Sequence, residues 1–207
     1  MKRISRLTVA IASLLLLVVY VTPLWRINLI APQYPEGLGL RIWVNQITGM
    51  KPNDLNSING LNHYIGMAPI DPASFPELQY MPKLLAAAIV AGLLVALIGR
   101  RPLLYVWSVL FALGAAAGLG DFYKWGYEYG HRLDPHAAIK VPGMSYQPPV
   151  IGSKQLLNFH ATSWPGVGGW VAILALGMVV TVAVLEWRRA HSAAPAVREM
   201  RAVKVLA

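Results

Sequence analysis

The chain has 207 residues, of which 56% are hydrophobic and 13% charged. Ordinary soluble domains carry about 25% charged residues, so this composition excludes a typical water-soluble globular protein. Lys and Arg outnumber Asp and Glu by 18 to 9, which gives a formal net charge of +9. The absence of cysteine excludes disulfides, cysteine-based zinc sites, iron–sulfur clusters, thiolate nucleophiles and covalently attached c-type haem.

Four apolar segments have the length of a membrane-spanning helix: residues 7–25, 82–99, 103–120 and 167–187. A helix needs about 20 mostly apolar residues to cross a bilayer. Because lipid offers no partner to unpaired backbone amides, we predict that each segment is a transmembrane helix. The first segment follows a basic N-terminus, residues 1–6, but it is longer than the apolar region of a typical signal peptide and has no small-x-small cleavage site after it. We therefore expect an uncleaved signal anchor.

The rest of the chain comprises two long segments, a short turn and a tail. Residues 26–81 and 121–166 are predicted to be loops, residues 100–102 join the second and third spans, and residues 188–207 form a basic tail. The two loops hold 102 residues together, which is too many for structureless connections. The predicted fold is an all-α integral membrane protein, a bundle of four transmembrane helices with a small extracytoplasmic cap made of the two loops.

The placement of charge predicts the orientation of these helices. The N-terminus, the short turn and the tail hold ten Lys and Arg, and with Glu186 and Glu199 their net charge is +8. The two long loops, counted with Lys83, hold eight cations and seven acids, a net charge of +1. The positive-inside rule then predicts a multi-pass protein of the bacterial inner membrane, with the N-terminus and C-terminus in the cytoplasm and both loops outside. Membrane topology therefore explains the excess of Lys and Arg over Asp and Glu, and we expect no nucleic-acid partner.

The predicted spans contain few groups for chemistry. They hold no His, so we expect no haem b within the membrane, and their cores lack the acids and bases typical of an ion pathway. Lys83 and Glu186 lie at span ends, where their side chains can reach the interface. Gly114 and Gly118 form a small-xxx-small pattern that favours close packing of another helix. We expect this packing within the bundle, with oligomerisation through the two glycines as the alternative.

The loops show weaker patterns of regular structure. Residues 40–44 alternate and predict a short strand, and residues 55–67 predict a helix that Asp54 or Asn56 caps. Residues 121–131 are expected to continue the third transmembrane helix beyond the membrane.

Histidine and methionine in the loops suggest a metal site. Thioether and imidazole groups are suitable ligands for copper, and His63 and Met67 share one face of the predicted helix because they are four residues apart. Met144 lies in a proline-rich segment and His160 lies just before the fourth span. We predict a copper site formed by His63, Met67, Met144 and His160. The alternative is that these side chains are buried or hydrogen-bonded residues of the cap, which is the commoner role of such residues.

A catalytic role has less support in the sequence. His131 and His136 can pair with Glu128 or Asp134 as acid–base groups, but loop histidines near carboxylates are more often structural or solvated. The serines of the second loop lack the sequence of a nucleophile elbow. Whether the protein is an enzyme stays open at this point, and no catalytic residue is assigned.

Four stretches of the loops, residues 34–38, 59–67, 141–149 and 152–159, resemble a known group. The chain resembles an uncharacterised family of small bacterial four-span membrane proteins that tend to be encoded beside the maturation genes of nitrous oxide reductase, a periplasmic copper enzyme. The resemblance covers about residues 7–187. It implies a role near copper insertion or electron supply for that reductase, and it transfers no ligand set.

These observations lead to one functional hypothesis and two alternatives. The leading hypothesis is a membrane-anchored accessory protein that assists assembly, copper supply or docking of a periplasmic metalloenzyme, with a periplasmic or membrane protein as its partner. The first alternative is a non-catalytic scaffold or interaction subunit without a metal site. The second is an enzyme that acts on a lipid or a quinone at the membrane interface.

Overall fold

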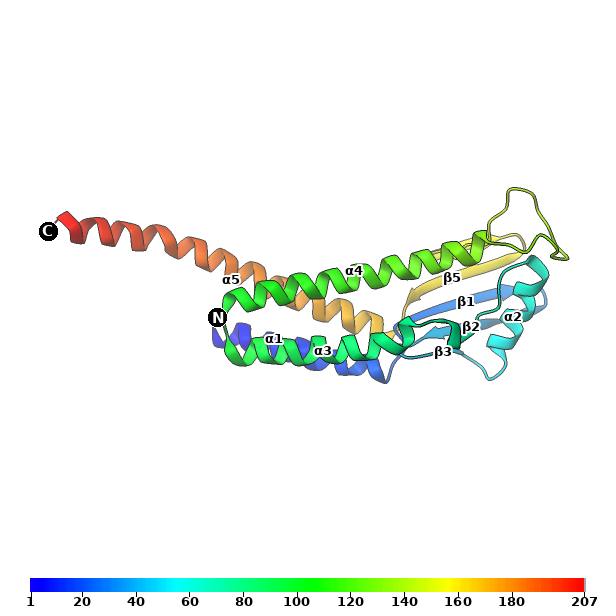
Figure 1. The fold of residues 1–207 in the computed structure, drawn as a ribbon, viewed down its shortest axis with the longest axis horizontal. Coiled ribbons are helices and arrows are strands. Elements are labelled where there is room, and N and C mark those ends of the chain that lie inside the picture. The colour runs from blue at the N-terminus through cyan, green and yellow to red at the C-terminus, as the bar shows by residue number, and fades with distance from the viewer. Residues whose placement is uncertain (207) are drawn as a thin grey trace.

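The structure is a computed structural model that describes the backbone of residues 1–206 and the side chains of residues 1–192. Its long helices are α1 (Arg3–Leu15), continued by the 3₁₀ helix η1 (Leu16–Tyr20), α3 (Glu77–Ile98), α4 (Arg101–His131) and α5 (Val167–Leu206). They lie side by side as a bundle (Figure 1). Four helical segments are long and apolar enough to cross a membrane, as the sequence predicts. The tail cations Arg198, Arg201 and Lys204 lie beyond the described side chains.

Outside the bundle the two predicted loops fold together around an antiparallel sheet. Its strands are β1 (Trp25–Ala31), β2 (Tyr34–Ile42), β3 (Ile47–Gly49), β4 (Gly152–Leu156) and β5 (Phe159–Pro165). Their order across the sheet is β3-β2-β1-β5-β4, so a strand of the first loop pairs with a strand of the second. We call this part of the chain, with helix α2, the sheet domain.

The prediction of an all-α fold is therefore wrong, because the molecule combines a helical bundle with a five-stranded sheet. Burial alternates along β1, with Trp25 and Ala31 buried at its ends. In the sequence, however, Trp25 and Arg26 also match an interfacial anchor at the end of a span, so this segment does not predict a strand. In β5 the buried positions include Ala161 and Ser163, which are too small or too polar to give a clear hydrophobic alternation. The strand predicted at residues 40–44 overlaps the end of β2, which runs further toward the N-terminus.

The sheet is joined closely to the bundle where β1 and β5 meet. Trp25 pairs with Pro165, so the chain enters the sheet from α1 and leaves it into α5 at the same point. Gly166 N donates to Leu24 O at 2.8 Å, and Gly168 N donates to Pro23 O at 3.0 Å. A Cβ added at Gly166 would overlap the carbonyl oxygen of Pro23. The glycines therefore permit a backbone-to-backbone contact that couples the two parts.

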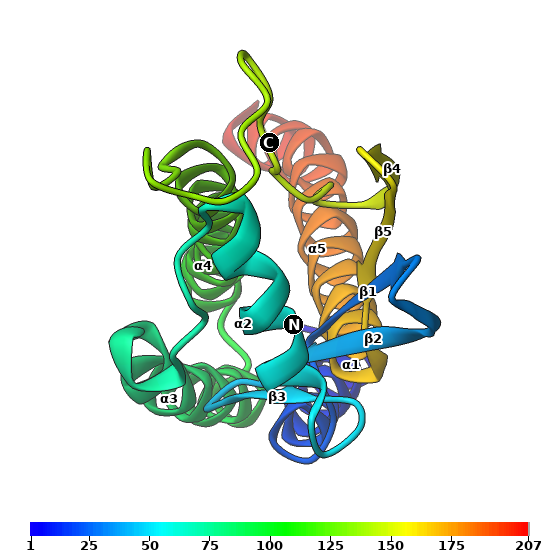
Figure 2. The ribbon, with the colours of Figure 1, turned by 90° about the vertical axis from the view of Figure 1, so that its right-hand side faces the viewer.

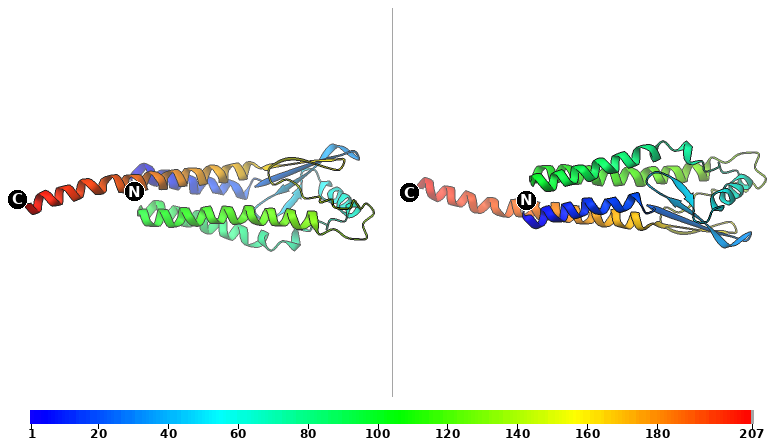
Figure 3. Two further views of the ribbon diagram at one scale, coloured as in Figure 1. Left: turned by 90° about the horizontal axis from the view of Figure 1, so that it is seen from above. Right: turned by 90° about the horizontal axis from the view of Figure 1, so that it is seen from below.

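Within the bundle, α1 packs against both α3 and α5, and α4 packs against both α5 and α3 (Figure 3). Gly92 of α3 lies so close to Ser13 of α1 and Trp107 of α4 that an added Cβ would overlap both side chains. By contrast, a Cβ added at Gly114 or Gly118 would meet nothing within 4 Å. The internal packing expected for the small-xxx-small pattern therefore does not involve these two glycines, and oligomerisation through them stays a prediction.

Two further helices complete the sheet domain. Helix α2 (Asp54–Ile65) agrees closely with the helix predicted at residues 55–67, and a short 3₁₀ helix, η2 (Pro72–Ser74), precedes α3. Asp54 is buried and accepts hydrogen bonds from Gly39 N of β2 and Lys51 N, so it joins α2 to the sheet. Viewed from the end of the molecule, α2 lies between α4 and the strands (Figure 2).

Helix α4 extends past the bundle into the sheet domain. Its 31 residues give a length of about 46 Å, compared with about 30 Å for the hydrocarbon core of a bilayer. Residues 121–131 are helical as predicted, and they lie alongside the sheet domain (Figure 1). The second loop therefore starts from a rigid helical support.

Candidate functional site

The structure brings two of the four predicted copper ligands to one place. Met67, just after α2, and Met144, in the proline-rich segment, both pack against the same apolar cluster. We call this the inner cluster; its buried members are Ala31, Ile65, Tyr146, Leu156, Phe159 and Ala161. Both methionines are half-buried. The fold thus gathers two thioethers that are 77 positions apart in the sequence.

The two predicted histidine ligands lie elsewhere. His63 is exposed on α2 and its ring lies beside that of Tyr64, with 6.1 Å between the centroids. His160 is exposed on β5 between the buried residues Phe159 and Ala161. Because side chains alternate along a strand, His160 lies on the opposite face of the sheet from the inner cluster.

Metal binding by these residues stays a prediction. Among the residues whose side chains are described, no group of three or more His, Asp and Glu is arranged to hold a metal ion. Met67 and Met144 are the two members of the predicted set that pack against the same apolar cluster.

The acid–base pairs considered in the sequence lie at the surface. His136 Nδ1 is 3.3 Å from Asp134 Oδ1, and both side chains are exposed. The backbone N–H of His136 donates to the same carboxylate oxygen, and this bond, ahead of the contributions of the His136 side chain, holds the pKa of Asp134 below its usual value. His131 stacks on Tyr127 with 4.0 Å between ring centroids. These contacts lie at the exposed end of α4 and in the segment after it, and none of these residues lines a cavity described below.

A cavity of about 90 Å³ lies between α2, α4 and the inner face of the sheet. Its wall is almost wholly apolar and includes Ile27, Leu29, Ile65, Met67, Phe159 and Ala161. Four of the lining residues have polar side chains: Asn62, Trp125, Tyr129 and Tyr146. Tyr129 donates its hydroxyl to Pro69 O at 3.1 Å. Within the described part of the chain, Nε1 of Trp125 and the hydroxyl of Tyr146 are buried and have no hydrogen-bond partner.

Local sequence explains how these aromatic residues reach the cavity. Gly130 near the end of α4 lies against Gln147, and a Cβ at this position would overlap the Gln147 backbone. Tyr146 N then donates to Gly130 O at 3.0 Å, which fixes the irregular segment against the helix. Trp125 lies on the same helix and its ring is tilted against that of Tyr129, with 4.9 Å between ring centroids.

The sequence patterns did not reveal this cavity. Trp125 matches the aromatic belt of a membrane interface, and Tyr146 lies in a segment with no periodicity. One available signal was the spacing of Ile58, Leu61 and Ile65, which places three apolar residues on one face of α2. That face indicates a buried surface in the cap, although it does not indicate a void within it.

A wider groove with a volume of about 610 Å³ lies along α2, and it shares the lining residues Leu61, Ile65 and Phe159 with the cavity. It has a mixed polar and apolar wall, formed by Gln33, Tyr34, Asn56, Ser57, Gly60, Leu61, Tyr64, Ile65, Ile139 and Phe159. We call this the outer groove. Gly60 has nothing within 4 Å of an added Cβ, so the surface there is open.

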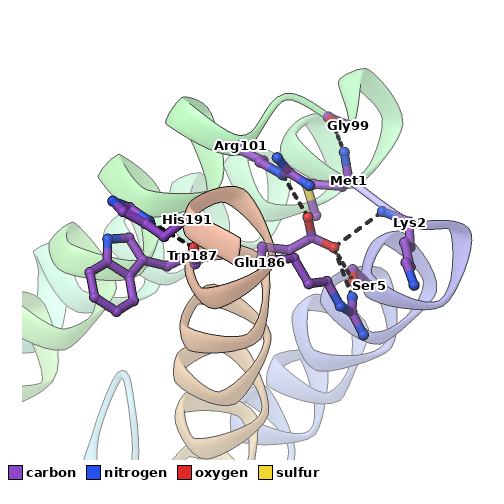
Figure 4. A network of polar contacts seen from close by, with 9 residues as sticks. Met1, Lys2, Ser5, Gly99, Arg101, Glu186, Trp187 and His191 are labelled. Atoms are coloured by element: carbon purple, nitrogen blue, oxygen red, sulfur yellow. Dashed lines mark hydrogen bonds and ion pairs between the residues drawn. The ribbon is translucent and has the colours of Figure 1, made fainter. Parts of the chain in front are cut away.

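At the opposite end of the bundle, Glu186 forms the centre of a polar network (Figure 4). Its side chain is 0% exposed. It accepts hydrogen bonds from Ser5 Oγ at 2.7 Å, Lys2 N at 3.2 Å, Arg101 Nε at 2.8 Å and Arg189 at 3.2 Å. The expectation that Glu186 reaches the membrane interface is therefore incomplete, because the carboxylate lies between helices and joins α1, α4 and α5.

Outside the sheet domain, most of the Lys and Arg side chains that the structure describes lie at this same end of the bundle. Arg6 donates from Nε to Ala96 O at 2.7 Å and from its guanidinium to Leu97 O, which satisfies carbonyl groups at the end of α3. The ammonium group of Met1 donates to Gly99 O at 2.9 Å. Cations and a single buried acid thus fix the helix ends at this side.

Comparisons with models of known protein families and with functionally characterised proteins find no match to this chain. The resemblance to the family encoded near nitrous oxide reductase genes therefore stays a prediction, and the function has to be argued from the geometry.

Proposed function

We propose that the protein is a non-enzymatic accessory protein of the bacterial inner membrane that presents its sheet domain to a periplasmic partner. The observation that carries this proposal is the continuity between bundle and sheet. The chain passes from η1 into β1 through the short turn at residues 21–24 and from β5 into α5 through Gly166, while α4 extends along the domain. A domain coupled in this way keeps a fixed distance and orientation above the bilayer, which suits the docking of another protein.

The charge distribution supports the orientation in this proposal. Lys2, Arg6, Arg101 and Arg189 gather around the bundle end that includes Glu186, whereas the segments that form the sheet domain are nearly neutral. The positive-inside rule assigns the basic end to the cytoplasm and the sheet domain to the periplasm.

The outer groove is the docking surface in this proposal. Its volume of about 610 Å³ and its mixed wall distinguish it from the small apolar cavity. Protein interfaces are enriched in aromatic residues and combine them with polar groups, as Tyr34, Tyr64 and Asn56 do here. The resemblance directs the proposal to one partner class, a periplasmic copper enzyme such as nitrous oxide reductase or its assembly factors.

The experiment uses a deletion strain of a bacterium that makes the protein and a nitrous oxide reductase. The copper content of the purified reductase is measured after complementation with the wild-type chain, with Gly60→Trp, or with the matched surface variant His136→Ala. Deletion is expected to lower the copper content; the wild type and His136→Ala restore it, and Gly60→Trp, which obstructs the outer groove, does not. A reductase with full copper content in the deletion strain would contradict the proposal.

A second candidate is that the chain itself carries copper, and the placement of Met67 and Met144 on one cluster favours it. Thioethers are suitable ligands for Cu(I). Copper bound to the purified protein under reducing conditions is expected to be stoichiometric in the wild type and in the control Met81→Leu. It is expected to be lost in Met67→Leu/Met144→Leu, which preserves apolar volume and removes both sulfur atoms. Copper no higher than background in the wild type would exclude this role.

A further inference from the structure

We propose that Arg101 and Arg189, at the basic end of the bundle, bind the phosphate of an anionic phospholipid of the cytoplasmic leaflet. The proposal shares the orientation of the bundle with the docking role and is otherwise independent of it, since it concerns the opposite end of the molecule from the outer groove. Three features carry it: two guanidinium groups held on one buried carboxylate, an excess of exposed cations around them, and their depth relative to the bilayer.

Glu186 positions the two guanidinium groups. Arg101 donates from Nε to one carboxylate oxygen at 2.8 Å, and Arg189 donates from Nη1 to the other at 3.2 Å. The carboxylate therefore brings side chains of α4 and α5 together at this end of the bundle (Figure 4). Each guanidinium has five N–H donors in a fixed plane. An arginine that is already held in place loses less side-chain freedom when it binds a phosphate than a mobile one does.

The remaining donors of these two arginines are accessible at the surface. The side chain of Glu186 is 0% exposed, but those of Arg101 and Arg189 are 40% and 39% exposed. Among the described residues, the one further contact of the two guanidinium groups joins Arg189 Nη1 to Ser5 Oγ at 3.4 Å, and none of their unpaired nitrogens is buried. A phosphate oxygen can therefore accept a charge-assisted hydrogen bond from each arginine while both stay paired with Glu186.

The surroundings of the two arginines favour an anionic lipid over a zwitterionic one. Lys2, Arg100 and Arg188 are exposed at the same end of the bundle, and Glu186 is the single acid there among the described side chains. This excess of cations attracts a head group with a net negative charge, such as that of phosphatidylglycerol. Phosphatidylethanolamine has the same phosphate, but its ammonium group is repelled by the cations nearby.

The depth of the arginines matches the position of lipid phosphates. Glu186 lies about 29 Å along α5 from Val167, its first residue, and the hydrocarbon core of a bilayer is about 30 Å thick. Trp170 near the start of α5 and Trp187 beside Glu186 are both exposed, as expected of aromatic residues at the two interfaces. The guanidinium groups around Glu186 therefore lie where the hydrocarbon core meets the head groups. A lipid phosphate reaches them at the surface of the bundle and needs no closed cavity.

Binding of phosphatidylglycerol to the purified full chain tests the site. Dissociation constants are measured by native mass spectrometry from detergent micelles, for phosphatidylglycerol and for phosphatidylethanolamine with the same acyl chains. We expect the wild type to bind phosphatidylglycerol about fivefold more tightly, because solvent partly screens the charges that distinguish the two head groups. Equal affinities of the wild type for the two lipids would overturn the proposal.

Charge-conserving variants separate this site from a general attraction between basic residues and anionic lipid. A lysine ammonium is a compact charge without the planar set of donors, so Arg101→Lys and Arg189→Lys are each expected to weaken phosphatidylglycerol binding about fivefold. Arg188→Lys changes an exposed neighbour outside the Glu186 network and is expected to bind like the wild type. A general field predicts no change in any of the three variants, because their net charge is that of the wild type. Equal affinities of Arg101→Lys and Arg188→Lys would contradict the site.

Thermal unfolding in nanodiscs separates lipid binding from a folding defect and from binding of a soluble anion. Each chain is compared in phosphatidylcholine with and without phosphatidylglycerol, so the intrinsic stability of a variant cancels within its own pair. The stabilisation by phosphatidylglycerol is expected to be smaller for Arg101→Lys than for the wild type, and to be the same in sodium phosphate as in sodium chloride of equal ionic strength. Equal stabilisation of the two chains, or loss of the effect in phosphate alone, which would identify a soluble anion as the ligand, would overturn the lipid assignment.

Discussion

At the scale of single residues, Glu186 is the side chain that joins most elements of the bundle. Its position near the end of a span does not reveal that it is buried. Glu186 is fully buried and its carboxylate is bound by groups from α1 and α4 as well as by Arg189 of its own helix. The sequence showed a lone acid next to a basic tail, but only the arrangement of three helices shows that its partners converge. Such convergence depends on tertiary packing and has no local pattern.

Replacing this acid tests how much the network stabilises the bundle. Glu186→Gln removes the charge that holds Arg101 and Arg189, and breaking a buried ion pair usually costs about 3–5 kcal/mol. Both arginines are more than a third exposed, so solvent screens the unpaired charges and we expect a loss of about 1–2 kcal/mol. Unfolding in mixed micelles measures it. Glu36→Gln, at an exposed acid of β2, is the control and should change stability by less than about 0.5 kcal/mol; equal stabilities of the two variants would contradict the role of Glu186.

At the scale of elements, the long helices were predictable, whereas only the end of β2 was predicted among the strands. Each span is a continuous apolar run, which length and composition identify without knowledge of any partner. The sheet depends on pairing between β1 and β5, whose partners are more than a hundred residues apart, as with Arg26 and Trp164. In β5 the inward residues Ala161 and Ser163 are small, so the hydrophobic alternation that marks a strand is weak. For the candidate site, the sequence predicts Met67 and Met144 as copper ligands, which stays a prediction, and only the fold shows that Trp125 and Tyr146 line one cavity.

The junction between sheet and bundle provides a prediction at this scale. Gly166→Ala places a methyl group against the Pro23 carbonyl, which is backbone and cannot move independently. We expect the variant to be less stable by about 1–3 kcal/mol, as for overpacking of a buried contact. Thermal unfolding in detergent measures this change in stability. Gly177→Ala in the same long helix has open space around its Cβ and should be neutral or slightly stabilising. Equal effects of the two variants would show that the junction is not closely packed.

At the scale of the whole molecule, the protein consists of an apolar bundle with a basic end and a nearly neutral sheet domain at the other end (Figure 1). The charge pattern and the four spans already indicated this polarity from the sequence. The structure adds that the two loops form one domain and that short connections, residues 21–24 and Gly166, join β1 and β5 of this domain to the bundle. Both the docking proposal and the lipid proposal require this domain to lie on the periplasmic face of the membrane.

The most direct test of that requirement uses the absence of native cysteine. Single cysteines are introduced at two exposed positions, His160→Cys in the sheet domain and Arg188→Cys at the basic end, and spheroplasts are treated with a membrane-impermeant maleimide. His160→Cys is predicted to be labelled in intact spheroplasts, and Arg188→Cys only after the membrane is permeabilised. Labelling of Arg188→Cys in intact spheroplasts, with His160→Cys protected, would contradict the proposed orientation and the functions that depend on it.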